Sequence, residues 1–256
     1  AEQRVVGDVQ AEHLALERQQ ILALPLGDLR DLHGERLLLG VVGIFGPVNG
    51  YQIRRELLSW QVDKWANVNP GSIYHALGKL SDSGDLTRRE VSDGSREVSV
   101  YEITESGQVR LHSMLEHAMI GVDVFDRSAF QAAFNLLPLL GDDHATTLLK
   151  QRLVTLQEVM REYTAATEPD ANPYAPPHAM EGARLWLRLA QAEADWLTDV
   201  IADVQNGTLS FLENADWTPP PDDPGHQMTV DRTDYRRILQ GEPGQDASSP
   251  RISTSE

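Results

Sequence analysis

Side chains that can contact phosphates and base edges recur between residues 49 and 96. Ser72, Tyr74, His75 and Lys79 follow Pro70-Gly71 at the predicted start of a helix, where free amides and the positive end of the helix dipole attract an anion. Hydroxyl groups suit phosphate or base contacts, and the Lys79 ammonium suits phosphate. This is the chemistry of a duplex DNA interface, and its candidate residues are Asn49, Tyr51, Arg54, Arg55, Ser72, Tyr74, His75, Lys79, Arg88, Arg89 and Arg96.

Five arginines flank this helix in the sequence. Arg54 and Arg55 come before it, and Arg88, Arg89 and Arg96 lie in a predicted hairpin after it. Arg96 comes directly after the turn of that hairpin, where a wing tip would enter the minor groove. Two alternatives stay open on pattern alone. Tyr74 could be a core aromatic residue with a surface hydroxyl, and Arg88-Arg89 could be a solvated strand end.

Apolar spacing and helix-ending residues predict the elements that position these side chains. The apolar run at 37–45 has a length that suits a buried strand or a buried helix, and Gly46-Pro47 after it favours the helix. Asn49 is the predicted N-cap of a helix over 50–59, with Tyr51 or Ile53, Leu57 and Leu58 facing inward. Residues 60–69 are predicted to be partly extended.

The next helix is predicted to begin at Pro70, with Asn69 as its cap, and to end at Gly84. Strands are predicted at 86–91 and 97–103 around a turn at 92–95, and Thr104 caps a further helix. A helix, a capped helix and a hairpin in this order predict a winged helix-turn-helix with a two-stranded wing. The inward face of the capped helix carries Ile73, Ala76, Leu77 and Leu80.

Beyond Gly107 the apolar spacing is helical, with helices predicted over 109–118, 122–140, 142–166 and 178–205. Long apolar faces need a partner, so we expect this half to pair two subunits and to space two recognition helices by about one turn of DNA, ~34 Å. A second hypothesis adds an effector pocket, whereas the alternative assigns the same aromatic side chains to the core. These residues are Phe125, Phe130, Phe134, Trp186 and Trp196.

The predicted fold class is mainly α, in four regions. Residues 1–33 form a helical arm that is either exposed to solvent or packed on a second subunit. Residues 34–115 form the winged helix-turn-helix DNA-binding domain, and residues 116–212 form a long-helix dimerisation and effector domain. From Thr218 onward only Tyr235 to Leu239 keep any periodicity, so residues 213–256 are predicted to be a largely disordered tail.

The net charge of −17 argues against nonspecific coating of nucleic acid or of an anionic membrane. Residues 34–110 are nearly neutral, with 9 Lys and Arg against 10 Asp and Glu, whereas residues 111–256 carry 10 against 23. A near-neutral segment binds phosphates when its cations share one face. The acidity therefore belongs mainly to the helical half.

Several classes of protein are excluded or disfavoured by motifs. The chain has no cysteine, no His-x-x-x-His pair, no Gly-rich phosphate loop and no Gly-x-Ser-x-Gly, so we expect neither an enzyme nor a metal or cofactor site. No apolar run approaches the ~20 residues of a membrane span. The first residues lack the pattern of a signal peptide, and we expect a cytoplasmic protein.

Five motifs combine into a family resemblance: Leu37-Leu38-Leu39-Gly40, Gly46-Pro47-Val48-Asn49-Gly50-Tyr51-Gln52-Ile53, Gly71-Ser72-Ile73-Tyr74-His75-Ala76-Leu77-Gly78-Lys79-Leu80, Gly84-Asp85-Leu86 and Tyr101-Glu102-Ile103-Thr104-Glu105-Ser106-Gly107. Through them residues 35–115 resemble the PadR family of transcriptional regulators. The resemblance implies a winged-helix dimer, usually a repressor, which swaps C-terminal helices between subunits and responds to small, often aromatic, molecules. The long C-terminal half resembles a subgroup with an extended dimerisation domain. Asp85 departs from the pattern, which has an apolar or uncharged residue there.

The sequence therefore predicts a homodimeric repressor that binds a double-stranded DNA operator and is released by a small-molecule effector. The alternative is a winged-helix protein-interaction module that does not bind DNA directly, with the acidic helical half as its working surface.

Overall fold

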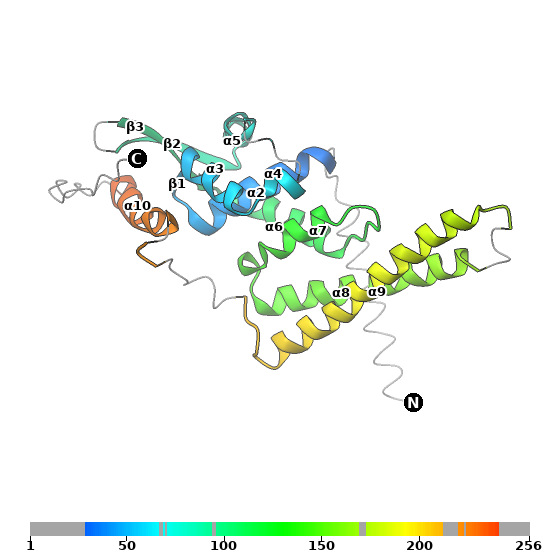
Figure 1. The fold of residues 1–256 in the computed structure, drawn as a ribbon. Coiled ribbons are helices and arrows are strands. Elements are labelled where there is room, and N and C mark those ends of the chain that lie inside the picture. Colours follow the sequence, from blue (N-terminus) through cyan, green and yellow to red (C-terminus); the bar gives the residue numbers. More distant parts are fainter. Residues whose placement is uncertain are drawn as a thin grey trace.

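The computed structural model describes residues 29–66, 69, 71–93, 96–168, 173–211, 220–222 and 224–240 (Figure 1). Most of the predicted N-terminal arm, residues 1–28, and the last part of the predicted tail lie outside these ranges. No helix within them is long and apolar enough to cross a membrane. The elements, in chain order, are α2 (Leu29–Phe45), β1 (Val48–Asn49), α3 (Gly50–Ser59), α4 (Val62–Trp65), α5 (Ile73–Asp82), β2 (Leu86–Asp93), β3 (Arg96–Ile103), α6 (Glu105–Ile120), α7 (Ser128–Phe134), the 3-10 helix η1 (Leu137–Leu139), α8 (Asp142–Ala166), α9 (Pro177–Gln205) and α10 (Pro224–Leu239).

The apolar run at residues 37–45 forms the second half of α2, so the helical alternative is confirmed. Leu37, Leu39 and Val41 are wholly buried. This part of α2 is apolar on several sides because the helix packs against α3, α5, α6 and α7. This central position explains why the run lacks the one-sided pattern of a surface helix.

Asn49 caps α3 as predicted. Its Oδ1 accepts a hydrogen bond from the Gln52 amide, and the Asn49 amide donates to Gln52 Oε1, both at a distance of 2.9 Å. These two bonds form a capping box that fixes the start of the helix. Ile53 and Leu57 are buried while Tyr51 is exposed, so Ile53 is the inward residue of the two alternatives.

Two predictions between residues 60 and 73 are wrong. Residues 62–65 are helical as α4 rather than extended, because Gln61 turns the chain in the left-handed region with a φ of 55°. Helix α5 begins at Ile73 rather than at Pro70. Asn69 instead starts a turn, closed by a 3.0 Å hydrogen bond from the Ser72 amide to the Asn69 carbonyl, and Ser72 is the N-cap.

The hairpin after α5 belongs to a three-stranded antiparallel sheet with the order β1-β3-β2. Its strands are longer than predicted and pair from Leu86 opposite Ile103 to Asp93 opposite Arg96. The short strand β1 adds a third member on the free side of β3, since Val48 and Asn49 pair with it. Helix, helix and three-stranded wing together form a winged helix, which confirms the predicted fold class.

The first of the predicted helices beyond residue 104 is confirmed, and the second is wrong. Thr104 Oγ1 accepts a hydrogen bond from the Gly107 amide and caps α6. Residues 122–140 do not form one helix. Gly121 is extended, so α6 ends, and the 7 residues of α7 are followed by η1, which contains Pro138.

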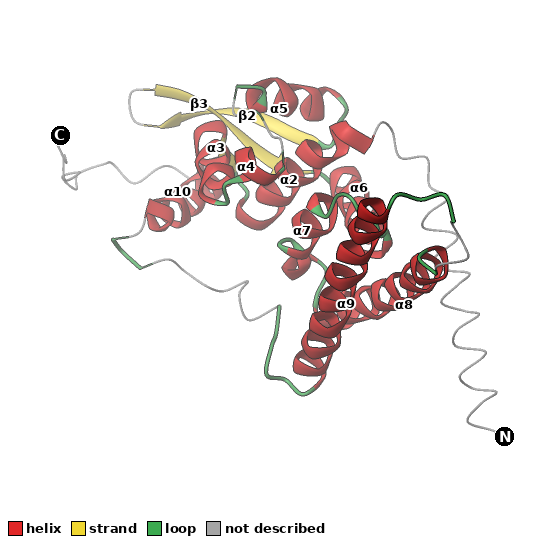
Figure 2. Ribbon diagram, turned by 45° about the vertical axis from the view of Figure 1, so that its right-hand side comes forward, coloured by secondary structure: helices red, strands yellow, loops and turns green. Residues whose placement is uncertain are grey.

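Helices α8 and α9 are confirmed close to their predicted limits. They lie side by side and project from the winged-helix domain, which comprises α2 to α6 with the sheet (Figures 1 and 2). Leu148, Leu149 and Leu156 of α8 and Leu197 of α9 are buried. These residues join the same core as the winged-helix domain.

Helix α10 differs from the expectation of an irregular tail. Pro224–Leu239 form 16 residues of helix, which lies beside β1 (Figure 1). Tyr235 packs with Val91 and Val100 on the outer face of the sheet, and Met228 reaches the main core. The apolar pattern of this segment is too sparse to predict a helix, and packing against the sheet stabilises it.

Candidate nucleic-acid interface

The predicted recognition helix α5 presents its polar side to solvent. Ile73, Leu77 and Leu80 are buried against the domain, whereas Tyr74 is 52% exposed and His75 is exposed. The structure therefore gives Tyr74 a surface position rather than a core position. Ile73 and its buried partners fix the helix, which leaves the other side free to face a partner.

Helices α3 and α5 approach one another closely at Gly50. A Cβ atom at this position would lie 2.7 Å from Cε1 of Tyr74. Gly50 is therefore needed so that the Tyr74 ring can lie over the start of α3. The contact brings the exposed Tyr51 and the exposed side of α5 into one surface.

The start of α3 also meets the wing. A cavity of about 310 Å³ lies between them, lined by Asn49, Gly50, Tyr51, Arg96, Val98, Ser99 and Tyr101. The positive end of the α3 dipole and the Arg96 guanidinium both belong to this wall. Such a recess suits a phosphate oxygen of a duplex backbone.

The other predicted cations do not form one continuous rim. Arg88 and Arg89 are neighbours in β2 and so point to opposite faces of the sheet. Arg88 pairs with Glu90 at 2.8 Å, and this hydrogen bond raises the pKa of Arg88. The pKa of Glu90 is lowered, first by the hydroxyl of Ser99 and then by Arg88. Arg54 and Arg55 are half-buried on α3.

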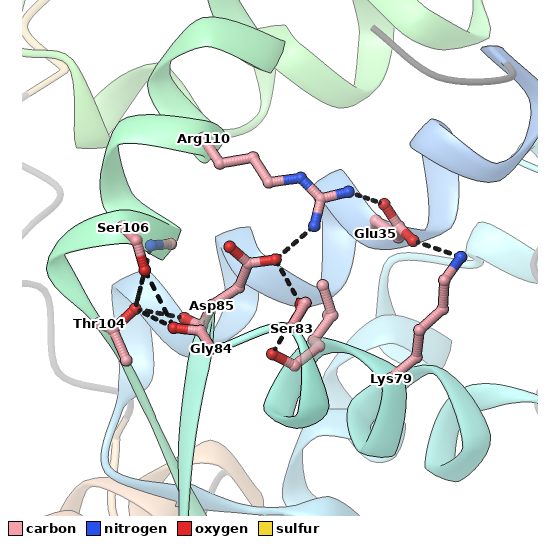
Figure 3. A network of polar contacts seen from close by, with 10 residues as sticks. Glu35, Lys79, Ser83, Gly84, Asp85, Thr104, Ser106 and Arg110 are labelled. Atoms are coloured by element: carbon pink, nitrogen blue, oxygen red, sulfur yellow. Dashed lines mark hydrogen bonds and ion pairs between the residues drawn. The ribbon is translucent and has the colours of Figure 1, made fainter.

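Lys79 is held by a polar network that the sequence did not indicate (Figure 3). Its Nζ lies 3.0 Å from Oε1 of Glu35, a buried residue of α2. Arg110 of α6 bridges Glu35 and Asp85. Two cations therefore balance two buried carboxylates, and the recognition helix is tied to α2 and α6.

The network also accounts for Asp85, which departs from the family pattern. Its carboxylate accepts hydrogen bonds from Arg110 and from Ser83, the latter at 2.8 Å. Its carbonyl accepts from the amide and the hydroxyl of Thr104, both at 3.1 Å. Both side-chain bonds are accepted by Oδ2, and the Asp85 amide donates to the Leu80 carbonyl, so this buried carboxylate has the partners that burial requires.

A second recess of about 1020 Å³ separates the winged-helix domain from the helical half. His75 and Lys79 of α5 line one side, and Arg152 of α8 lines the other. Arg152 is 1% exposed, pairs with Glu193 at 2.6 Å and stacks 3.6 Å above the Phe130 ring centre. Burial lowers the pKa of Arg152, while Glu193 opposes this effect.

Two nitrogen atoms in the walls of this large cavity are buried without a hydrogen-bond partner among the described residues, Nε of Arg36 and Nδ1 of His117. Burial lowers the pKa of Arg36 to about 10, so its guanidinium is still charged at neutral pH. Both residues line the cavity together with the Phe130 ring. An anionic aromatic molecule would fit this chemistry.

The aromatic residues predicted to line an effector site divide into two groups. Phe130, Phe134 and Trp196 pack together, with centroids 5.0–6.1 Å apart, around a smaller cavity of about 450 Å³ that Trp65 also lines. Phe125 and Trp186 form a separate edge-to-face pair at 4.6 Å. Only Phe130 of the five lines the large cavity as well. Within the described residues, no group of three or more acidic or histidine side chains could hold a metal ion.

The fold and the exposed face of α5 define a winged-helix protein. Residues 38–113 match the family model described as "Transcriptional regulator PadR-like family". Residues 38–113 are therefore a PadR-like domain, and this match supports a role in transcriptional regulation. The comparison with curated proteins found no match.

Solved structures that are similar include Bacillus subtilis PadR in complex with operator DNA and smu.1604c from Streptococcus mutans UA159. Each is 24% identical over 66% of this chain and 98% of the other, with a TM-score of 0.30. A third is Bacillus subtilis PadR in complex with p-coumaric acid, 19% identical over 66% and 99% of the two chains, with a TM-score of 0.28.

Proposed function

We propose that the protein is a homodimeric repressor that binds operator DNA through α5, the start of α3 and the wing, and that a small molecule releases it. The observation that carries the proposal is the joint surface at Gly50, where Tyr74, Tyr51 and the α3 dipole adjoin the recess that Arg96 lines. The surface combines phosphate-binding and base-reading groups within one PadR-like domain.

The proposed DNA contacts are Tyr51, Ser72, Tyr74, His75 and Arg96, with Lys79 available once it leaves Glu35. Asn49 would act as the cap of α3. Arg88 and Arg89 would reach DNA from opposite faces of the wing, and Arg54 and Arg55 would reach it from α3, where both are half-buried. The near-neutral charge of the domain makes a few placed cations decisive.

Dimerisation is supported by a second apolar stripe on α9. Leu197 and its buried neighbours face α8, but Leu185 and Leu189 are 55% and 44% exposed. An apolar stripe on the outer side of a long helix is the surface that a second subunit would cover.

The proposed effector site is the large cavity of about 1020 Å³, because it borders α5 on one side and α8 on the other. Arg36 and His117 would bind a carboxylate, and Phe130 would contact an aromatic ring. The effector class is then an aromatic carboxylic acid, of which p-coumaric acid is a convenient member. Phe134 and Trp196 would support the Phe130 ring from behind.

DNA binding is tested with the full-length protein and the DNA upstream of its own gene, over a salt series from low to physiological concentration. Arg96→Ala should weaken binding to specific and random DNA alike and flatten the slope of log affinity against log salt by about 1, since one phosphate contact is lost. Arg188→Ala, an exposed arginine of α9, is the matched control and should change neither. Failure of the unaltered protein to shift any DNA would refute the proposal.

A further inference from the structure

Helix α10 contacts both members of the capping box that starts α3. Asn49 Nδ2 donates a 2.9 Å hydrogen bond to Tyr235 Oη, and Gln52 Nε2 donates a 2.8 Å hydrogen bond to Asp231 Oδ2. In each amide side chain the oxygen serves the capping box and the nitrogen serves α10. The two ends of each amide are thus used by different elements, which fixes both side chains in one orientation.

The docking of α10 is apolar as well as polar. Tyr235 is 3% exposed and packs on Val91 and Val100, and Met228 is 4% exposed in the main core. Met228, Asp231 and Tyr235 are spaced by three and four residues, so they share one side of the helix. The same side therefore carries the burial and both hydrogen bonds.

Helix α10 leaves the proposed DNA face open. Gly50 faces Tyr74 of α5, whereas Gln52, two positions later and about 200° further around α3, faces α10. Tyr51 remains 63% exposed with α10 in place. Figures 1 and 2 show α10 and α5 on opposite sides of the sheet. Helix α10 therefore contacts α3 at Gln52 and leaves uncovered the side of α3 that is proposed to face DNA.

We propose that Asp231 and Tyr235 are positioning residues that hold the start of α3 in its DNA-contacting geometry. The inference rests on the proposed function, because the end of α3 that they hold forms the recess with Arg96. Without their acceptors, the buried amide of Gln52 and the half-buried amide of Asn49 would each lose a partner, and the capping box would sample other orientations. The DNA-binding unit then comprises the winged-helix domain and a helix from the far end of the described chain.

The test uses Tyr235→Phe and Asp231→Ala in the full-length protein. Thr233→Ala is the control, since Thr233 is exposed on the same helix and bonds only within it. Each test variant should bind upstream DNA roughly fivefold more weakly, the effect of one hydrogen bond. Hydrogen exchange at the Gln52 amide should become faster by a similar factor, and this readout needs no DNA.

A third measurement separates loss of a hydroxyl from loss of the whole helix. The chain has no cysteine, so Val100→Cys places a single thiol beneath α10, at a position 1% exposed. In the Tyr235→Phe background this thiol should react with a thiol reagent as slowly as in the otherwise unaltered chain. A faster reaction would overturn the assignment to the hydroxyl, because α10 would then have left the sheet.

Two further outcomes would overturn the proposal: unchanged exchange at Gln52, or faster exchange with unchanged DNA affinity. Failure of the proposed function is seen separately, as the absence of DNA binding by the unaltered protein. In that case the exchange data still decide whether α10 fixes α3, and the link to DNA is refuted.

Discussion

Lys79, a predicted DNA contact, already forms an ion pair within the protein. The residue lies on the exposed side of α5, yet its ammonium is 3.0 Å from the Glu35 carboxylate. The Lys79 side chain is 60% exposed, whereas that of Glu35 is 8% exposed and also pairs with Arg110. In the proposed complex Lys79 would leave Glu35 for a DNA phosphate, and this exchange would reduce the net gain from the contact.

Glu35→Gln should strengthen DNA binding by about twofold to fivefold, because Lys79 no longer has to leave a carboxylate. The slope of log affinity against log salt should become steeper by up to about 1. The free energy of unfolding should fall by about 1–3 kcal/mol, since Arg110 keeps only Asp85. Affinity titrations and denaturant unfolding measure the two effects.

Glu105→Gln is the matched control for this change, because it removes one negative charge from an exposed position in the first turn of α6. It should leave the salt slope as it is. If Glu35→Gln also left the slope unaltered, Lys79 would not contact phosphate at all.

Local patterns predicted the elements whose signals are local. Asn49 and Thr104 cap their helices through residues three positions away, and the buried face of α5 follows from its helical period. The exposure of Tyr74 and His75 follows from the same period. The sequence therefore sufficed to place the exposed side of α5.

What the sequence did not predict depends on distant partners. Asp85 looks unfavourable until Arg110 is placed beside it, and Asn49 meets a tyrosine 186 residues away. Helix α10 has only a few apolar residues among Asp, Thr and Arg, so its pattern is weak without the sheet it covers. The end of α6 also involves a distant partner, because Gly121 is extended and its carbonyl accepts a hydrogen bond from Arg152, 31 residues away.

The outer stripe of α9 gives a prediction at the level of one element. Leu189→Glu should convert the dimer to a monomer in size-exclusion chromatography with light scattering, because a charge would be buried in an apolar contact. Upstream DNA should then be bound at least tenfold more weakly, since two half-sites are no longer bound together.

Gln205→Glu adds the same charge at an exposed position of α9 that lies off the stripe. Its mass in solution should equal that of the unaltered protein. A dimeric Leu189→Glu protein would place the subunit contact elsewhere.

On the scale of the whole molecule, the large cavity joins the two functional halves. Its walls include α5 from the winged-helix domain and α6, α7 and α8 around Phe130 and Arg152. A molecule bound there would touch the recognition helix and the long-helix region at once. Release of DNA then requires only that the ligand prefer one arrangement of these walls.

His117→Ala should raise the concentration of p-coumaric acid needed to release DNA by about fivefold or more, because a donor to the carboxylate is lost. DNA affinity without the acid should stay the same. His112→Ala, an exposed histidine of the same helix, should respond like the unaltered protein. Equal release curves for all three proteins would exclude this cavity as the effector site.

The docking of α10 also determines when one face of the sheet is covered during synthesis of the chain. The side-chain amide of Asn49 bonds to Tyr235, 186 residues further along the chain, and that of Gln52 bonds to Asp231, 179 residues further along. Contacts of such sequence separation form late, and until they do Val91 and Val100 are uncovered. A chain that ends before residue 224 would contain the whole winged-helix domain but leave Val91 and Val100 uncovered. Exposed apolar surface of this kind is a target for chaperones and proteases.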